Sequence, residues 1–242
     1  MHVGVTLSSQ RDIKVKVCGI TTLEDAHLVA EAGADYIGVI IDVNFSPRRL
    51  TVEQARPICE RSTLPVVTLF FNQNVDQIQG AIAALNPHAV QLLGQEPPSL
   101  VKTLKRTAAC ELWKSIHLPP QGLGEVNIAE HRDRVNSFTD AGIDVIVIDT
   151  VVTHPQRKLR YGGTGQVNNW AAACKLVELS PVRTFLAGGI NPENVEQAIE
   201  LVHPHGIDLC SGVEIAPGQK DPEKLRQLML TARRSVTKSR QR

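Results

Sequence analysis

Cys18 and Asp149 are the residues of this chain whose types and positions best fit proton transfer. Each stands at the end of a short stretch rich in β-branched residues. A cysteine acts as a general base or nucleophile only as the thiolate, so its pKa must fall from about 8.5 through a nearby cation or dipole. Lys16 precedes Cys18 by two positions, shares a strand face with it and is the candidate cation. The alternative is a buried, inert cysteine beside a structural lysine.

Asp149 is placed to serve as the complementary acid. It directly follows the apolar run Val145-Ile-Val-Ile148. A carboxyl group beside an apolar strand loses hydration, which disfavours its charged form and raises its pKa. It could then donate a proton near neutral pH. The competing interpretation is a helix cap or a salt bridge to a loop arginine.

Arg48 is a candidate for holding an anionic part of a substrate. It lies in the segment Phe45-Ser-Pro-Arg-Arg49, just after a predicted strand. A guanidinium at the mouth of a site binds a carboxylate through two parallel hydrogen bonds. An ordinary exposed loop arginine is the alternative.

Three glycine-bearing stretches predict a phosphate site. Glycine lets backbone N–H groups approach an anion closely, and a following helix N-terminus adds a favourable dipole and unpaired donors. The candidate ligands are Gly162, Gly163, Gly165, Gly188, Gly189, Ser211 and Gly212. A tight turn explains any single stretch, but three at matching positions favour phosphate binding. No clustered histidines or carboxylates indicate a metal site, and none is expected.

The elements that would position these groups alternate between short apolar runs and segments with helical spacing, as in βαβ units around a buried parallel sheet. The predicted strands are Lys14–Gly19, Tyr36–Asp42, Pro65–Phe71, Ala89–Leu93, Leu112–His117, Asp144–Asp149, Thr184–Ala187 and Gly206–Cys210. The predicted helices are Thr22–Ala32, Val52–Arg61, Val75–Leu85, Ser99–Arg106, Ala129–Ala141, Asn169–Glu178, Glu193–Val202 and Pro222–Arg233. Thr22, Thr51 and Asn191 are predicted to cap helices.

Eight such pairs predict the α/β class and a single (β/α)8 TIM barrel with a parallel sheet. The candidate residues then gather at the carboxyl ends of the strands, with the first and sixth strands facing each other across the mouth. An open, doubly wound sheet is the alternative, but the first strand ends in Cys18-Gly-Ile-Thr21 and has no G-x-G-x-x-G turn after it. The long connection Val151–Val167 has a length typical of functional loops.

Composition excludes several classes of protein. The 242 residues, 42% of them hydrophobic, suit one large domain. We expect an N-terminal extension over residues 1–13, the barrel over 14–232 and a basic, frayed tail over 233–242. A net charge of +1 gives no footprint for nucleic acid, and no apolar run is long enough to span a membrane. Five scattered cysteines suit reduced thiols, and together with the lack of a signal peptide they predict a cytoplasmic protein.

Several motifs, taken in order along the chain, resemble one known family. They are Lys16-Val-Cys-Gly-Ile-Thr21, Ser46-Pro-Arg48, Val90-Gln-Leu92, Ile148-Asp-Thr150, Gly162-Gly-Thr-Gly165, Leu186-Ala-Gly-Gly-Ile-Asn-Pro-Glu-Asn194, Ser211-Gly-Val-Glu214 and Pro217-Gly-Gln-Lys-Asp221. Together, over about Lys14 to Met229, they resemble phosphoribosylanthranilate isomerase of tryptophan biosynthesis.

The resemblance implies an Amadori rearrangement of an N-phosphoribosyl aminobenzoate, with a small phosphosugar substrate and no cofactor. By position, Cys18 matches the family's general base, Asp149 its general acid and Arg48 its ligand for the anthranilate carboxylate. The three glycine stretches match its phosphate loops. The oligomeric state is expected to be a monomer or a homodimer.

Three positions depart from the family pattern. Leu93 stands where the family has histidine, and Gln166-Val-Asn-Asn-Trp170 replaces the usual Lys-x-Phe-Asp-Trp. The second strand reads Gly38-Val-Ile-Ile-Asp-Val-Asn44, with an apparent one-residue insertion. This puts Asp42 near the expected aryl pocket, where an unpaired carboxylate would repel the substrate carboxylate. Two alternatives therefore stay open: a related barrel enzyme that isomerises or cleaves another phosphosugar conjugate, and a non-catalytic barrel that binds a phosphometabolite.

Overall fold

The computed structural model describes residues 13–123, 125–153, 159–161 and 167–239, and it contains a closed barrel of eight parallel strands. The barrel strands are β1 (Lys14–Cys18), β2 (Tyr36–Ile41), β4 (Val66–Phe70), β5 (Ala89–Leu92), β6 (Glu111–Leu118), β7 (Val145–Thr153), β9 (Arg183–Leu186) and β10 (Gly206–Leu209). They follow one another around the barrel, and the pairing of β1 with β2 closes it. The predicted TIM barrel is confirmed.

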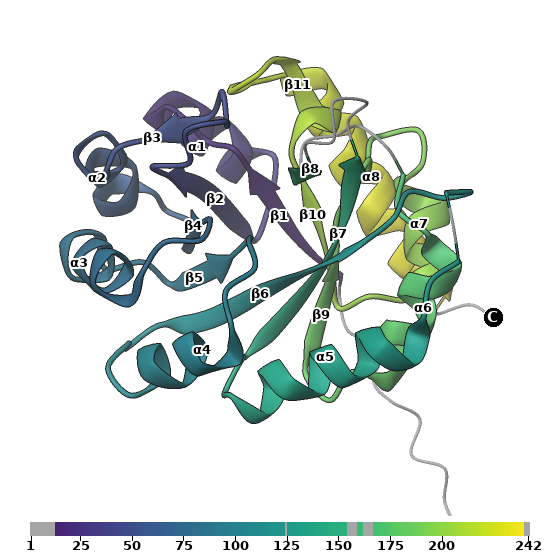
Figure 1. The fold of residues 1–242 in the computed structure, drawn as a ribbon. Coiled ribbons are helices and arrows are strands. Elements are labelled where there is room, and N and C mark those ends of the chain that lie inside the picture. Colours follow the sequence, from purple (N-terminus) through teal and green to yellow (C-terminus); the bar gives the residue numbers. More distant parts are fainter. Residues whose placement is uncertain (1–12, 124, 154–158, 162–166, 240–242) are drawn as a thin grey trace, which may run out of the picture.

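Helices form the outer layer, so that each strand is followed by a helix on the outside of the barrel (Figure 1). They are α1 (Leu23–Glu31), α2 (Val52–Arg61), α3 (Val75–Leu85), α4 (Pro98–Lys105), α5 (Ile128–Asp140), α6 (Trp170–Leu179), α7 (Val195–Val202) and α8 (Pro222–Ser239). None of the described helices is long and apolar enough to cross a membrane.

Side chains at several helix starts satisfy the first free backbone donors, as predicted for two threonines. Thr22 accepts a hydrogen bond from the backbone N–H of Asp25, and Thr51 forms a capping box with Gln54. Asn191 behaves differently from the prediction. Its side chain accepts from two backbone N–H groups of a turn, and α7 begins only at Val195.

Additional short strands lie at the end of the barrel where the parallel strands finish. They are β3 (Arg49–Leu50) beside β2, β8 (Leu159–Tyr161) antiparallel to the end of β7, and the hairpin of β11 (Glu214–Ala216) with β12 (Gln219–Lys220). One turn of 3-10 helix, η1 (Ser211–Val213), connects β10 to this hairpin. The extra strands surround the carboxyl end of the barrel, the end that carries the site.

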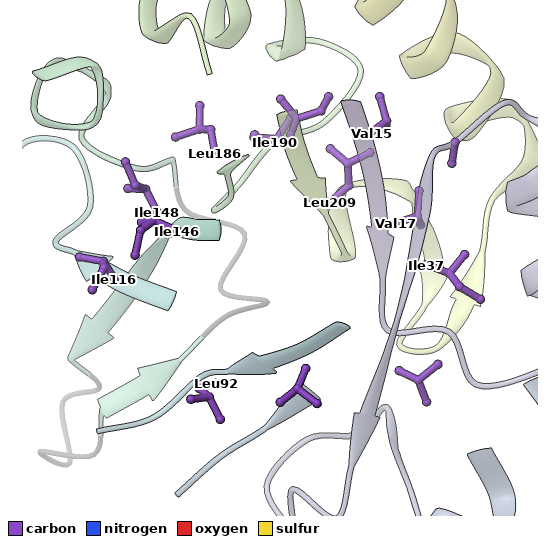
Figure 2. Close-up of a cluster of buried hydrophobic side chains, with 14 of the residues drawn as sticks. Val15, Val17, Ile37, Leu92, Ile116, Ile146, Ile148, Leu186, Ile190 and Leu209 are labelled. Carbon is purple, nitrogen blue, oxygen red and sulfur yellow. The ribbon is translucent and has the colours of Figure 1, made fainter. Parts of the chain in front are cut away.

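Two apolar layers result from the alternation of side chains along each strand. The outer layer packs the strands against the helices, and Figure 2 shows part of it, including Val15, Val17, Ile37, Ile148 and Leu209. The inner layer fills the barrel. Its members alternate with those of the outer layer and are Cys18, Ile40, Val43, Val67, Leu69, Ala89, Trp113, Val145, Val147, Phe185 and Ala187. A side chain on the inner face near a strand's end therefore reaches the mouth.

Two details differ from the prediction. The last helix continues to Ser239, beyond its predicted end at Arg233. Arg233 donates to the backbone carbonyl of Ile13 and pairs with Asp35, which holds the helix against the start of β1. In addition, β7 lies three places from β1 around the barrel, and the strand diametrically opposite β1 is β6.

Candidate active site

Cys18 and Cys210 lie side by side where β1 and β10 end. The two strands pair in parallel through Val17 and Leu209, so the next residue of each is its neighbour's counterpart. Cys18 is buried and donates a hydrogen bond to the sulfur of Cys210, which is partly exposed. A Cβ at Gly38 on β2 would come within 2.9 Å of Cys18 Sγ, so glycine there makes room for the thiol. Sequence reasoning found Cys18 but missed its neighbour.

Lys16 is buried and committed to a different partner from the one expected. Its Nζ lies 2.8 Å from Asp208 Oδ2, and both side chains are inside the barrel. The hydrogen bond to Cys210 and burial raise the pKa of Cys18 well above its ordinary value, and they outweigh the opposing effect of Lys16. Lys16 lowers this pKa, as expected of a nearby cation, but not enough to bring it below its ordinary value.

Cys210 is the more acidic of the two thiols. The hydrogen bond received from Cys18 lowers the pKa of Cys210, and the positive charges of Lys220 and Arg48 lower it further against the effect of burial. Cys210 is therefore the thiol of the pair whose surroundings favour the thiolate.

Asp149 lies on the inner face in the middle of β7, one residue beyond the part of that strand that pairs with β9. Its Oδ1 accepts a hydrogen bond of 2.7 Å from the backbone N–H of Thr150. Burial, assisted by the charge of Asp208, raises the pKa of Asp149 to about 7, although Thr150 and Lys16 oppose the rise. The predicted elevation of this pKa is confirmed, and the carboxyl group is partly protonated at neutral pH.

His117 on β6 is the cross-strand neighbour of Asp149 and was missed by sequence reasoning. It is buried on the same inner face as Trp113 and Ser115. Burial and the nearby charges of Lys114 and Arg134 lower the pKa of His117 to about 3, so the imidazole is neutral at physiological pH. The alternating pattern of β6 was the signal that could have revealed it.

Arg48 reaches the mouth, but its guanidinium already holds a carboxylate. Its Nε and Nη2 donate to Glu214, with Nε 2.9 Å from Glu214 Oε1. Lys220 Nζ lies 2.9 Å from the same carboxylate oxygen and also donates to the backbone carbonyl of Cys18. The Arg48 side chain passes so close to Gly19 that a Cβ there would lie 3.3 Å from Nε. Only the edge formed by Nη1 and Nη2 therefore remains for a substrate carboxylate, whereas the whole guanidinium was expected to be available.

An apolar wall borders the mouth beside β2, β4 and β5. Leu93, Phe71 and Val43 pack onto the inner cluster that contains Cys18. The ring of Phe45 stands at right angles to that of Phe71, with centroids 4.9 Å apart, and is itself largely exposed. We call these four residues the apolar wall.

The expected conflict at Asp42 does not occur. Its backbone adopts a positive φ of 52°, and its side chain is exposed to solvent. The next residue, Val43, is the one that packs inward onto the cluster. Exposure removes the burial penalty that the sequence analysis assigned to this carboxylate.

Two of the three predicted phosphate stretches come together in the structure. Gly212 in η1 packs directly against the carbonyl of Ile190, so closely that a Cβ would collide with it. Gly188 and Gly189, just after β9, both have positive φ, and Gly188 presses against Thr150 in the same way. These contacts join the loops after β9 and β10 to the strand that carries Asp149. Gly162, Gly163 and Gly165 lie outside the described residues, as do parts of the long connection between β7 and α6.

Comparisons with known proteins point to one group. The family model described as N-(5'-phosphoribosyl)anthranilate (PRA) isomerase matches residues 15–230. A protein of that name from Methanocella arvoryzae is 36% identical over 93% of this chain and 99% of its own length. Another, from Geobacter metallireducens, is 34% identical over 91% and 99%.

Solved structures give the same result. The phosphoribosyl anthranilate isomerase of Thermotoga maritima superposes with a TM-score of 0.75 at 30% identity and covers 91% of this chain and 98% of its own. A second structure, in complex with reduced 1-(o-carboxyphenylamino)-1-deoxyribulose 5-phosphate, has a TM-score of 0.72 at 28% identity, with the same shares covered.

Proposed function

This chain belongs to the N-(5'-phosphoribosyl)anthranilate isomerase family, and on that premise we propose that it isomerises N-(5'-phosphoribosyl)anthranilate to the 1-deoxyribulose 5-phosphate product in tryptophan biosynthesis. The observation that carries the proposal is the shared position of Cys18, Asp149 and two paired glycine loops at the carboxyl end of one barrel. In barrels of this kind that end is where chemistry takes place.

Asp149 acts as the general acid of the first step. It protonates the furanose ring oxygen while the bond from that oxygen to C1′ breaks and the nitrogen lone pair forms a C1′=N double bond. Because the pKa of Asp149 is about 7, a substantial fraction of this carboxyl group carries a proton at neutral pH, and the carboxylate that remains after transfer is stable. Its neighbour His117 is neutral and places no competing positive charge beside it.

Cys18 acts as the general base of the second step. Its thiolate takes the proton from C2′, and the electrons of that C–H bond form the C1′=C2′ bond of an enolamine. Loss of the enol proton and protonation at C1′ then give the ketose. The surroundings of Cys18 favour its protonated form, and those of Cys210 favour the thiolate. Transfer of the Cys18 proton to Cys210 is therefore the step proposed to prepare the base.

Binding groups surround these two residues. Backbone N–H groups of Gly188, Gly189, Ser211 and Gly212 are proposed to hold the phosphate, with Gly162, Gly163 and Gly165 as further ligands. The Nη1–Nη2 edge of Arg48 is assigned to the anthranilate carboxylate. The apolar wall is assigned to the anthranilate ring, since Phe45 and Phe71 present aromatic surface at the mouth.

Both steps are proton transfers, so the proposal includes no cofactor. The Thermotoga maritima relative is described as dimeric, and for this chain we propose a monomer or a homodimer. All five cysteines are free in the structure, which agrees with the proposed cytoplasmic location.

Two experiments test the proposal. The first is complementation: the gene should restore growth without tryptophan to a bacterium that lacks this isomerase, and Cys18→Ala and Asp149→Asn versions should not. The second follows purified protein with N-(5'-phosphoribosyl)anthranilate made in place, using chromatography with mass detection to separate the isomers. A well-folded protein that leaves this substrate unchanged but isomerises a conjugate with another aglycone would assign the site to a related reaction.

A further inference from the structure

The cysteine pair at the mouth has a second chemistry that proton transfer does not use. Cys18 and Cys210 each follow by one position the last paired residues of β1 and β10, Val17 and Leu209. The side chains two places earlier, Lys16 and Asp208, are in contact at 2.8 Å. Side chains two apart on a strand share a face. The two thiols therefore point the same way, into the mouth.

The spacing of the strands suits a disulfide. Neighbouring strands lie about 4.8 Å apart, and the Cα atoms of a disulfide are usually separated by roughly 4.4 to 6.8 Å. The two thiols are close enough for each to shift the pKa of the other. Gly19 and Gly38 leave the space around them open, because a Cβ at either position would come within 2.9 Å of one of the two sulfurs.

We propose that Cys18 and Cys210 form a reversible disulfide that switches the enzyme off under oxidation. The bond itself follows from the placement of the two thiols. Its effect on activity rests on the proposed function, since the disulfide would remove the base from the acid-base pair.

A low-molecular-weight disulfide such as oxidised glutathione serves as the oxidant. The partly exposed Cys210 attacks first as the thiolate, forms a mixed disulfide and releases one glutathione thiolate. Cys18 then attacks the Cys210 sulfur and displaces the second glutathione as a thiolate. This glutathione thiolate takes up the proton that Cys18 loses. Two protein thiols are oxidised and one glutathione disulfide is reduced to two thiols. A reducing thiol reverses both steps.

The charges around Cys210 favour it as the attacking thiol. Arg48 and Lys220, which hold Glu214, also place positive charge near the Cys210 sulfur. Cations near a sulfur increase its thiolate fraction and hence its reactivity. The remaining cysteines differ: burial raises the pKa of Cys59 to about 11 and also raises that of Cys110.

The test uses the whole protein with Cys59, Cys110 and Cys174 replaced by alanine, so that only the pair remains. The protein is incubated with oxidised glutathione, then blocked with iodoacetamide, digested and mapped by mass spectrometry. We expect loss of both thiols per chain, a peptide that links Cys18 to Cys210, and loss of isomerase activity in proportion to the linked fraction. Dithiothreitol should restore both thiols and activity.

A Cys210→Ser version in the same background is the matched control. It should form no internal link. Relative to its own activity before oxidation, it should stay active far longer in oxidised glutathione than the protein that has both cysteines. Two results would overturn the proposal: a mixed disulfide of glutathione with either cysteine and no Cys18–Cys210 disulfide, or a protein that contains the Cys18–Cys210 disulfide and remains active. Mass spectrometry detects the disulfide independently of activity. A protein without isomerase activity would therefore refute the proposed function, while the experiment would still show whether the disulfide forms.

Discussion

His117 and Asp149 are cross-strand neighbours on β6 and β7 whose titrations are displaced in opposite directions. Burial is the largest cause for both. It raises the pKa of the carboxyl group to about 7 and lowers that of the imidazole to about 3. Between these values both side chains are mostly neutral, so a proton is available on the acid and His117 adds no positive charge beside it.

Asp149→Asn should remove the general acid while preserving the shape of the side chain. We expect kcat/KM to fall by about 10² to 10⁴. In the parent enzyme, kcat/KM should decline as pH rises through about 7, the pKa of Asp149. An Asp149→Glu version should keep part of the activity and move that decline. A parent profile flat from pH 6 to 8.5 would rule out this role for the carboxyl group.

The same substitution should change how stability depends on pH. The pKa of Asp149 is higher in the folded protein than its ordinary value of 3.8, so the folded state holds the proton more tightly. Its contribution is complete below about pH 4 and is lost as pH rises through about 7. Asp149→Asn should therefore gain stability relative to the parent between pH 4 and 8, by roughly 2 to 4 kcal/mol. Urea unfolding at several pH values measures this.

His117→Gln should have the opposite signature. The folded protein keeps His117 neutral down to about pH 3, whereas the unfolded chain binds a proton near 6.5. This residue therefore stabilises the fold fully above pH 6.5, and the contribution is lost as pH falls toward 3. The glutamine protein should lose less stability than the parent between pH 7 and 4. His27→Gln, at an exposed position of α1, is the control, and equal acid sensitivity of all three proteins would contradict the assignment.

The barrel was predictable because its signals are local. Runs of β-branched residues followed by helical spacing recur eight times, and every predicted strand overlaps an observed one. Asp149 and Cys18 were found for the same reason, since each ends such a run. The local sequence does not reveal which residue of a neighbouring strand each side chain contacts.

Long-range pairing and backbone conformation account for the errors. Lys16 was assigned to Cys18, but Asp208, distant in sequence and adjacent in the barrel, takes its charge. Arg48 was expected to be free, but Glu214 returns to it from the far end of the chain. Asp42 was placed in the pocket because the sequence does not reveal a positive φ at a residue other than glycine.

Arg48→Lys should test recognition of the substrate carboxylate. Lysine keeps the positive charge next to Glu214 but cannot present two parallel donors. We expect KM to rise by about tenfold or more, the equivalent of one charge-assisted hydrogen bond, with a smaller change in kcat. The neighbouring Arg49→Lys is the matched control, because the Arg49 side chain is exposed and, among the described contacts, donates only to the carbonyl of Asn44. Equal KM values for the two proteins would remove Arg48 from the binding site.

Gly188→Ala should separate the phosphate site from general stability. Gly188 has a φ of +88°, and a Cβ there would collide with the side chain of Thr150, next to the general acid. The strained backbone alone should destabilise the fold by about 1 to 3 kcal/mol, and displacement of the loop should weaken the hold on phosphate.

Gly80→Ala in α3 is its control, because no atom lies within 4 Å of the added Cβ and helix propensity favours alanine by about 1 kcal/mol. Inhibition by inorganic phosphate is the direct measurement. The inhibition constant should rise several-fold in the Gly188→Ala protein, assayed where it remains folded, and stay at the parent value in the Gly80→Ala protein. An unchanged constant in both would place the phosphate elsewhere on the barrel rim.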